Sequence, residues 1–156
     1  MKAKVSIIMG STSDLPVMEK AAKVLNDFKI PFEIHALSAH RTPEEVEKFA
    51  KGAFDRGIKA IIAGAGMAAH LPRVIAPMTP IQVIGVPINA SLDGMDALLS
   101  IAQMPPGIPV ATVGINGAMN AGILAGQMLA IADSELQKDV IAFKESLKEK
   151  IVKANE

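Results

Sequence analysis

Short hydrophobic runs alternate with longer amphipathic segments along the whole chain. The runs predict strands, because an apolar stretch of about four to eight residues bounded by turn residues suits a strand that is buried on both faces. They cover residues 5–9, 32–37, 59–63, 81–86 and 110–115. The other segments place apolar residues three and four positions apart, which is the period of a helix with one buried face. These predicted helices cover residues 15–28, 43–56, 68–76, 93–103, 118–132 and about 134–153.

Strands that alternate with helices predict one parallel sheet with helices on both faces. Five such strands are typical of a flavodoxin-like α/β fold, a three-layer αβα sandwich with a five-stranded parallel sheet. A length of 156 residues, half of them hydrophobic, suits one compact domain that spans residues 1–156. Ligands of such sheets bind at the carboxyl ends of the strands, so a site is expected in the loops that follow them.

The helix predicted over residues 118–132 has almost no polar face. Only Asn120 and Gln127 interrupt a segment that is rich in alanine and glycine. It is either a central helix of the core or a helix buried between protomers. We expect burial between protomers, because small residues let backbones approach closely, and therefore a homo-oligomer.

The sequence GSTSD at residues 10–14 follows the first predicted strand. The hydroxyls of Ser11 and Ser13, together with the free N–H groups of the next helix, suit a phosphate. Asp14 can accept hydrogen bonds from ribose hydroxyls. The segment is neither a P-loop nor a GxGxxG loop. The alternative is that Ser13 or Asp14 only caps the helix.

The sequence SAHRTP at residues 38–43 follows the second predicted strand. His40 can transfer a proton near neutral pH, and Arg41 can hold a phosphate. Alternatively, both are exposed surface side chains without a role in binding or catalysis. Thr42 is expected to cap the next helix, with Pro43 in its first turn. His35, which lies within the strand, is interpreted as structural.

The sequence GAGMAAHLP at residues 64–72 follows the third predicted strand. Small residues allow a backbone to approach a ligand closely, and His70 adds a second imidazole at the same edge of the sheet. The alternative is a tightly packed turn in which His70 caps a helix. Asp93 and Asp96, after the fourth strand, are possible site acids, but charges in a first helical turn are the preferred interpretation.

These loops together predict a tight, mostly apolar pocket for a phosphate-bearing small molecule, with groups that can transfer protons. A metal ion is not expected, because two histidines 30 residues apart without a fixed carboxylate are no recognised metal pattern. Nucleic acid is not expected either: Lys plus Arg and Asp plus Glu are both 16, and the 3% aromatic residues are all phenylalanine.

The chain has no cysteine, which excludes thiol nucleophiles and zinc–thiolate sites and fits a cytoplasmic protein. The apolar run near the N-terminus is only five residues long, too short for a secretory signal. No apolar stretch reaches the roughly 18 residues of a membrane span. We therefore expect no membrane partner.

Five motifs occur in an order that resembles one known family: MGSTSDLPVM, SAHRTP, GAGMAAHLP, SLDGMDALLSIAQMP and NAGILA. They are similar to the class I PurE family, the N5-carboxyaminoimidazole ribonucleotide mutases of de novo purine synthesis. The resemblance covers about residues 4–130. It implies a flavodoxin-like fold, a homo-octamer, and a reaction that needs no metal, ATP or biotin.

The resemblance also implies roles for individual residues. His40 matches the catalytic histidine and is expected to act as the general acid/base of a transfer that passes through CO2 held in a closed pocket, with His70 as a supporting group at most. Ser11, Asp14 and Arg41 match substrate-binding positions. The full set of expected substrate-binding residues is Ser11, Ser13, Asp14, Ser38, Ala39, Arg41, Gly64, Ala65, Gly66, Ala68, Ala69, His70 and Leu71.

Two residues depart from the family's usual GAGGAAHLPG: Met67 and Arg73 stand where it has glycine. If either glycine has a positive φ, the substitution costs free energy. The Met67 side chain is long enough to intrude on the substrate cavity, and Arg73 adds a positive charge near it.

Three rival functions remain. The class II relatives are carboxylases that use free CO2 and have lysine where Arg41 stands, so Arg41 and the AAHLP sequence favour class I. A related carboxylase of pyridinium dinucleotide chemistry uses a cysteine, which this chain lacks. A flavin- or nucleotide-sensing module is disfavoured because no Trp or Tyr is present to stack on a flavin ring.

Overall fold

A computed structural model describes all residues from 1 to 156. Its centre is one parallel sheet with the strand order β2-β1-β3-β4-β5. The strands are β1 (Val5–Met9), β2 (Phe32–Ala36), β3 (Ala60–Gly66), β4 (Gln82–Ile88) and β5 (Ala111–Thr112). The main helices are α1 (Leu15–Asp27), α2 (Pro43–Ala53), α3 (His70–Ile75), α4 (Met95–Ala102), α5 (Ala118–Ala130) and α6 (Ser134–Lys153). This order and layering confirm the predicted flavodoxin-like fold.

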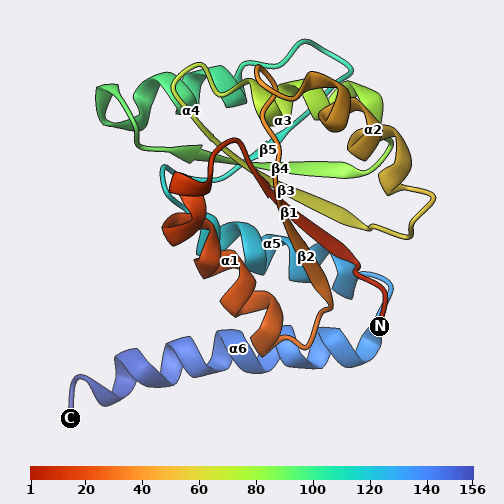
Figure 1. Cartoon of the computed structure of the whole chain (residues 1–156). Helices are drawn as coiled ribbons and strands as arrows, with labels where there is room; N and C mark the ends of the chain where they lie inside the picture. Colours follow the sequence, from red (N-terminus) through yellow and green to blue (C-terminus); the bar gives the residue numbers. More distant parts are fainter.

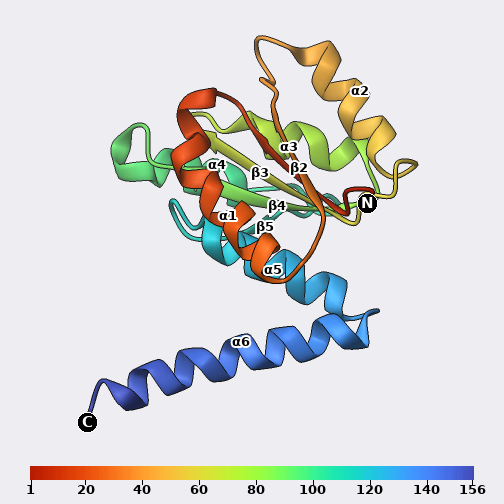
Figure 2. The same ribbon diagram turned by 60° about the horizontal axis from the view of Figure 1, so that its bottom comes forward.

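The helices cover both faces of the sheet (Figure 1). Helices α1 and α5 lie on one face, and α2, α3 and α4 lie on the other. Helix α6 packs along the outside of α5 at its start, and its C-terminal half projects past the rest of the molecule (Figure 2). No helix combines the length and hydrophobicity that crossing a bilayer would require.

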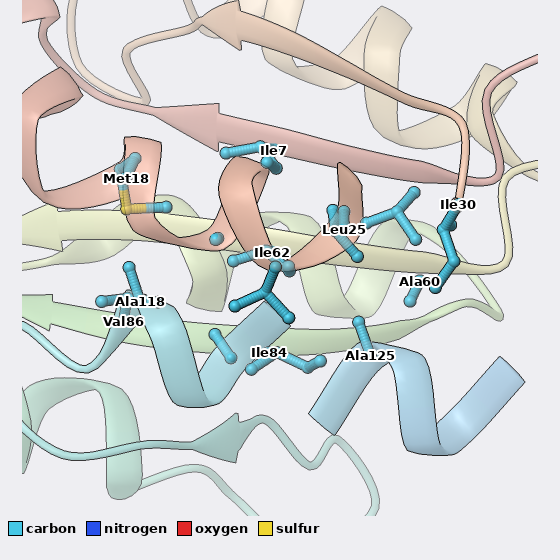
Figure 3. Packing of buried hydrophobic residues seen from close by; sticks show 14 of the residues in the cluster. Ile7, Met18, Leu25, Ile30, Ala60, Ile62, Ile84, Val86, Ala118 and Ala125 are labelled. Atoms are coloured by element: carbon cyan, nitrogen blue, oxygen red, sulfur yellow. The ribbon is translucent and has the colours of Figure 1, made fainter. Parts of the chain in front are cut away.

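Each face of the sheet has its own hydrophobic core. On one face, 20 buried residues include Ile7, Ile62 and Ile84 from the strands, which meet Leu25 of α1 and Ala125 of α5 (Figure 3). On the opposite face a second cluster of 15 buried residues packs beneath α2, α3 and α4. Alternate side chains of a strand point to opposite faces, so a strand covered on both sides must be apolar throughout. This explains why the strands appear in the sequence as uninterrupted apolar runs.

The predicted elements exist, but several boundaries differ. β3 runs on to Gly66 and β4 to Ile88, while β5 is limited to Ala111–Thr112 instead of residues 110–115. Two helices begin later than predicted, at His70 and at Met95. In both cases the backbone just before the helix takes a left-handed conformation, which periodicity does not reveal.

Thr42 holds the position before α2, but the predicted side-chain cap is wrong. Its Oγ1 accepts a hydrogen bond from the Ser38 N–H at 2.9 Å and donates to the Ser38 carbonyl at 3.0 Å. No side-chain bond reaches the helix. Thr42 therefore closes the loop between β2 and α2.

The small residues of α5 are used within one chain. A Cβ added at Gly122 would lie 3.0 Å from the Ala21 carbonyl oxygen, and one added at Gly126 would lie 2.8 Å from the Phe28 ring. α1 therefore covers the small-residue face of α5. The core-helix alternative describes this face, and burial of the remaining surface of α5 between protomers stays a prediction.

We predict opposite effects for the same substitution in two helices. Gly52→Ala in α2 should raise the free energy of unfolding by about 0.5–1 kcal/mol, because nothing lies within 4 Å of the new Cβ and alanine is the better helix former. Gly126→Ala should lower it by about 1 kcal/mol or more, because the Cβ collides with Phe28. Urea unfolding of both variants checks this, and an equal gain at both positions would contradict close packing of α1 on α5.

Candidate active site

The register of the sheet brings three loops to one edge. Met9, the last residue of β1, pairs with Ala36 of β2 on one side and with Gly64 of β3 on the other. The segments that follow these residues therefore leave the sheet side by side. They enclose a cavity of about 460 Å³, whose lining residues are Gly10, Ser11, Ser13, Asp14, Ser38, Ala39, His40, Arg41, Ala65, Gly66, Met67, Ala69, His70, Leu71 and Ala90.

The loop after β1 leaves a carboxylate free. Ser11 Oγ accepts a hydrogen bond from the Ser13 N–H at 3.2 Å and caps the short 3-10 turn Thr12–Asp14. Ser13 and Asp14 therefore do not have the capping role that was their alternative. Asp14 stands at the start of α1 without a side-chain capping bond, and burial raises its pKa against the opposing effect of a backbone hydrogen bond at Ser11. This carboxylate is available to accept hydrogen bonds from a ligand.

The loop after β2 contributes an arginine to the lining of the cavity. Arg41 Nη2 donates to the Gly10 carbonyl at 2.8 Å, and the Arg41 N–H donates to Ser38 Oγ at 3.0 Å. The first bond connects two of the three loops and fixes the guanidinium, and the second lies within the loop after β2. None of the chain's ion pairs includes Arg41. Its charge can therefore pair with an anionic ligand such as a phosphate.

Two histidines from different loops meet in the lining of the cavity. His40 Nε2 and His70 Nδ1 are 2.5 Å apart, and the rings are close to perpendicular at 81°. One of the two nitrogens must be without a proton for this contact to be a hydrogen bond, so the pair can carry at most one extra proton. Burial, the positive charge of Arg73 and His40 together lower the pKa of His70.

The loop after β3 has an unusual backbone. Met67 has φ = 54° and Ala69 has φ = 50°, values in the left-handed region that normally favours glycine. Met67, which replaces a glycine of the family pattern, therefore has the positive φ at which a substitution of glycine costs free energy. Its side chain lines the cavity but is 60% exposed, so it lies at the rim. Gly66 keeps the loop close to the next one, because a Cβ there would lie 2.9 Å from the Ala90 Cβ.

Two of the predicted binding residues do not line the cavity. Gly64 faces α1, where an added Cβ would lie 2.5 Å from Met18 Sδ, so its small size serves helix packing. The Ala68 carbonyl turns away and accepts hydrogen bonds from Ser100 Oγ and from Arg73 Nη2. Both residues share a segment with lining residues, and the sequence does not reveal which way each one faces.

Sequence reasoning left three lining residues outside the predicted set: Gly10, Met67 and Ala90. Gly10 belongs to the GSTSD motif itself. Ala90 follows β4, the neighbour of β3, so the rule that ligands sit at carboxyl ends would have been enough to find it.

Three titratable residues lie outside the cavity, in agreement with the structural interpretation that the sequence favoured for each of them. The Asp96 carboxylate accepts hydrogen bonds from Ser91 Oγ and from the Ala97 N–H, so it belongs to the start of α4. Asp93 is likewise not among the lining residues. His35 Nε2 lies 3.4 Å from Glu33 Oε1 on the edge strand β2.

Comparison with known proteins places the chain among nucleotide-metabolising enzymes. Residues 4–150 match the family model described as AIR carboxylase. The N5-carboxyaminoimidazole ribonucleotide mutase of Pyrococcus abyssi is 58% identical over 146 residues, 93% of this chain and 84% of that protein. The phosphoribosylaminoimidazole carboxylase of Candida glabrata is 55% identical over 97% of this chain but only 27% of that protein. The crystal structure of Treponema denticola PurE2-S38D superposes with a TM-score of 0.90 at 31% identity, covering 99% of this chain and 97% of that one.

We predict that Asp14→Asn stabilises the free protein at neutral pH. The pKa of Asp14 is raised on folding, so ionisation of this carboxyl group opposes folding once the pH is above its pKa. The gain should stay below about 1 kcal/mol because solvent still reaches the carboxylate, and it should vanish at a pH at which Asp14 is protonated in both states. Thermal unfolding between pH 3 and pH 8 measures it, with the exposed Asp55→Asn as control. A loss of stability at pH 7 would contradict the proposed burial cost.

Proposed function

The chain belongs to the AIR carboxylase family, and we propose that it is an N5-carboxyaminoimidazole ribonucleotide mutase, an isomerase of purine biosynthesis. The enzyme moves a carboxylate from N5 to C4 of the imidazole and produces 4-carboxy-5-aminoimidazole ribonucleotide. The observation that carries the proposal is that Asp14, His40 and Arg41, from two different loops, line one cavity. A cytoplasmic location follows from the family resemblance and stays a prediction.

The polar groups of the cavity suit the ribose phosphate of this substrate. The Arg41 guanidinium and the hydroxyls of Ser11 and Ser13 offer hydrogen bonds to phosphate oxygens. Asp14 accepts hydrogen bonds from the ribose hydroxyls. A volume of about 460 Å³ lies within the usual range of roughly 300–1,000 Å³ for small-molecule sites. The imidazole then extends toward the loop after β3.

The chemistry needs one group that gives a proton and takes one back. Protonated His40 donates to N5 of the substrate, the N5–carboxylate bond breaks, and CO2 is released while its bonding electrons stay on nitrogen. C4 of the electron-rich aminoimidazole then attacks the CO2 carbon. The tetrahedral C4 loses its hydrogen as a proton to His40, which restores the aromatic ring. No net proton is consumed, and an imidazole titrates in the range that both transfers require.

CO2 must stay beside C4 between the two steps. Ala65 and Ala69 line the cavity with small apolar side chains that are only 7% and 2% exposed, and His70 adjoins them. Ala65 and Ala69 support a wall that excludes water and limits the escape of CO2.

The closest alternative is a carboxylase that takes free CO2. A test separates the two functions: purified protein should convert N5-carboxyaminoimidazole ribonucleotide to the C4 carboxylate in buffer depleted of CO2 and bicarbonate. A requirement for added bicarbonate, with aminoimidazole ribonucleotide as the accepted substrate, would identify the carboxylase instead.

We predict that His40→Asn reduces kcat by about 10²–10⁴-fold, because an amide cannot exchange the proton. Ligand binding should persist, since Arg41 and Asp14 remain in place; equilibrium binding of the product nucleotide measures this. The matched control is His35→Asn, an imidazole outside the cavity that should keep wild-type turnover. Retention of more than about a tenth of the turnover in His40→Asn would count against His40 as the acid/base.

Helix α6 supports self-association, and the family resemblance implies a homo-octamer. Leu136, Val140 and Phe143 form an apolar stripe that packs against the hydrophobic core behind α5. Leu147 and Ile151 continue this stripe at helical spacing, yet they are 47% and 68% exposed. A second copy of the chain would cover this part of the stripe.

We predict that Leu147→Glu combined with Ile151→Glu dissociates the oligomer, because each new carboxylate would have to be buried in the contact. Lys148→Glu, on the same helix but beside the stripe, is the control that changes the net charge by the same two units and removes only an exposed ion pair with Glu145. Sedimentation velocity at low micromolar concentration measures the outcome. A wild-type monomer would contradict the oligomer, and an unchanged assembly of the double variant would exclude the stripe as its contact.

A further inference from the structure

Arg73 turns from α3 back toward the strained loop after β3. Its Nη2 donates to the Ala68 carbonyl at 3.0 Å, and Ser100 Oγ of α4 donates to the same oxygen. Ala68 lies between Met67 and Ala69, the two residues with left-handed backbone. Two donors from two helices therefore hold the residue that lies between these two. Burial of the unpartnered Arg73 Nε shows how closely the guanidinium is packed here.

Arg73 also lies one helical turn after His70. Residues three apart on a helix are neighbours on its surface, so the guanidinium acts on the imidazole at short range. Its positive charge disfavours a second positive charge on His70 and is the second-largest cause, after burial, of the lowered pKa of His70.

The other charged groups near His70 are on neighbouring elements. His40, from the loop after β2, is in direct contact with it and also opposes its protonation. Arg41 and Asp14 line the same cavity, and neither is among the causes of the His70 shift. Arg73 is therefore the one permanent charge that lowers the pKa of His70.

We propose that Arg73 is a positioning residue for the reaction, which holds the loop at residues 67–69 and keeps the single proton of the His40–His70 pair on His40. This inference rests on the proposed function, in which protonated His40 starts the reaction. Neutral His70 then accepts through Nδ1 the hydrogen bond that His40 donates through Nε2, and this bond orients the His40 ring. Without the Arg73 charge, the proton would be shared with His70, and less of the enzyme would carry it on the ring that protonates the substrate.

Three variants separate charge from loop support. Arg73→Gln keeps a donor near the Ala68 carbonyl but removes the charge, and Arg73→Lys keeps the charge. Ser100→Ala removes the second donor to Ala68 and leaves the charge in place. NMR titration of the imidazoles in the free protein, assigned with His40→Asn and His70→Asn, reports the His70 midpoint without any need for turnover.

We expect Arg73→Gln to raise the His70 midpoint by about 0.3 pH unit or more, while Arg73→Lys and Ser100→Ala leave it within about 0.1 unit. In turnover assays Arg73→Gln should lower kcat by about two- to tenfold with little change in KM, and Arg73→Lys should restore kcat. An unchanged midpoint in Arg73→Gln, or an equal loss of kcat in Ser100→Ala and Arg73→Gln, would overturn the role of the charge.

A further measurement does not depend on how well the Arg73 variants fold. In His40→Asn with Arg73 intact, His70 should still titrate below its ordinary pKa of about 6.5, and a midpoint at or above that value would overturn the proposal. If the wild type lacks mutase turnover, the proposed function fails, while the titrations still decide whether Arg73 acts on His70.

Discussion

The parallel pairing of β1 between β2 and β3 is the constraint on which the site depends. Because Met9 is in register with both Ala36 and Gly64, the three strands end at nearly the same level. The loops that follow them therefore lie next to one another, and residues that are far apart in the sequence line one cavity. Two apolar cores, one on each face, hold this register, since a slip of one residue would exchange the side chains of a strand between faces.

Much of this could be predicted from the sequence, because the signals involved are local or periodic. The apolar run of β1 and the amphipathic pattern of α6 predicted the observed boundaries of these two elements. The fold followed from the alternation of predicted strands and helices along the chain. The cavity loops followed from the rule for carboxyl ends of strands. The roles proposed for His40, Arg41 and Asp14 needed the family resemblance, because a lone histidine or arginine in a loop has no distinctive pattern.

What the sequence missed depends on contacts between distant segments. Gly64 resembles a binding glycine, but its lack of a side chain makes room for Met18 of α1. Thr42 resembles a helix cap, but its hydroxyl bonds back to Ser38. The alanine and glycine content of α5 did not reveal that Gly122 and Gly126 pack against α1 of the same chain. In each case the residue type was informative about size or hydrogen bonding, while its partner was decided by the tertiary structure.

The conformation of the loop after β3 is held by side chains from two neighbouring helices. Glycine would make its left-handed residues intrinsically favourable, whereas here the side chains of Arg73 and Ser100 fasten the Ala68 carbonyl to α3 and α4. Hydrogen bonds thus connect this wall of the cavity directly to these two helices. A displacement of either helix, for example by contact with another protein, would be transmitted directly to His70 and its partner ring, whereas a loop shaped by its own glycines would absorb it.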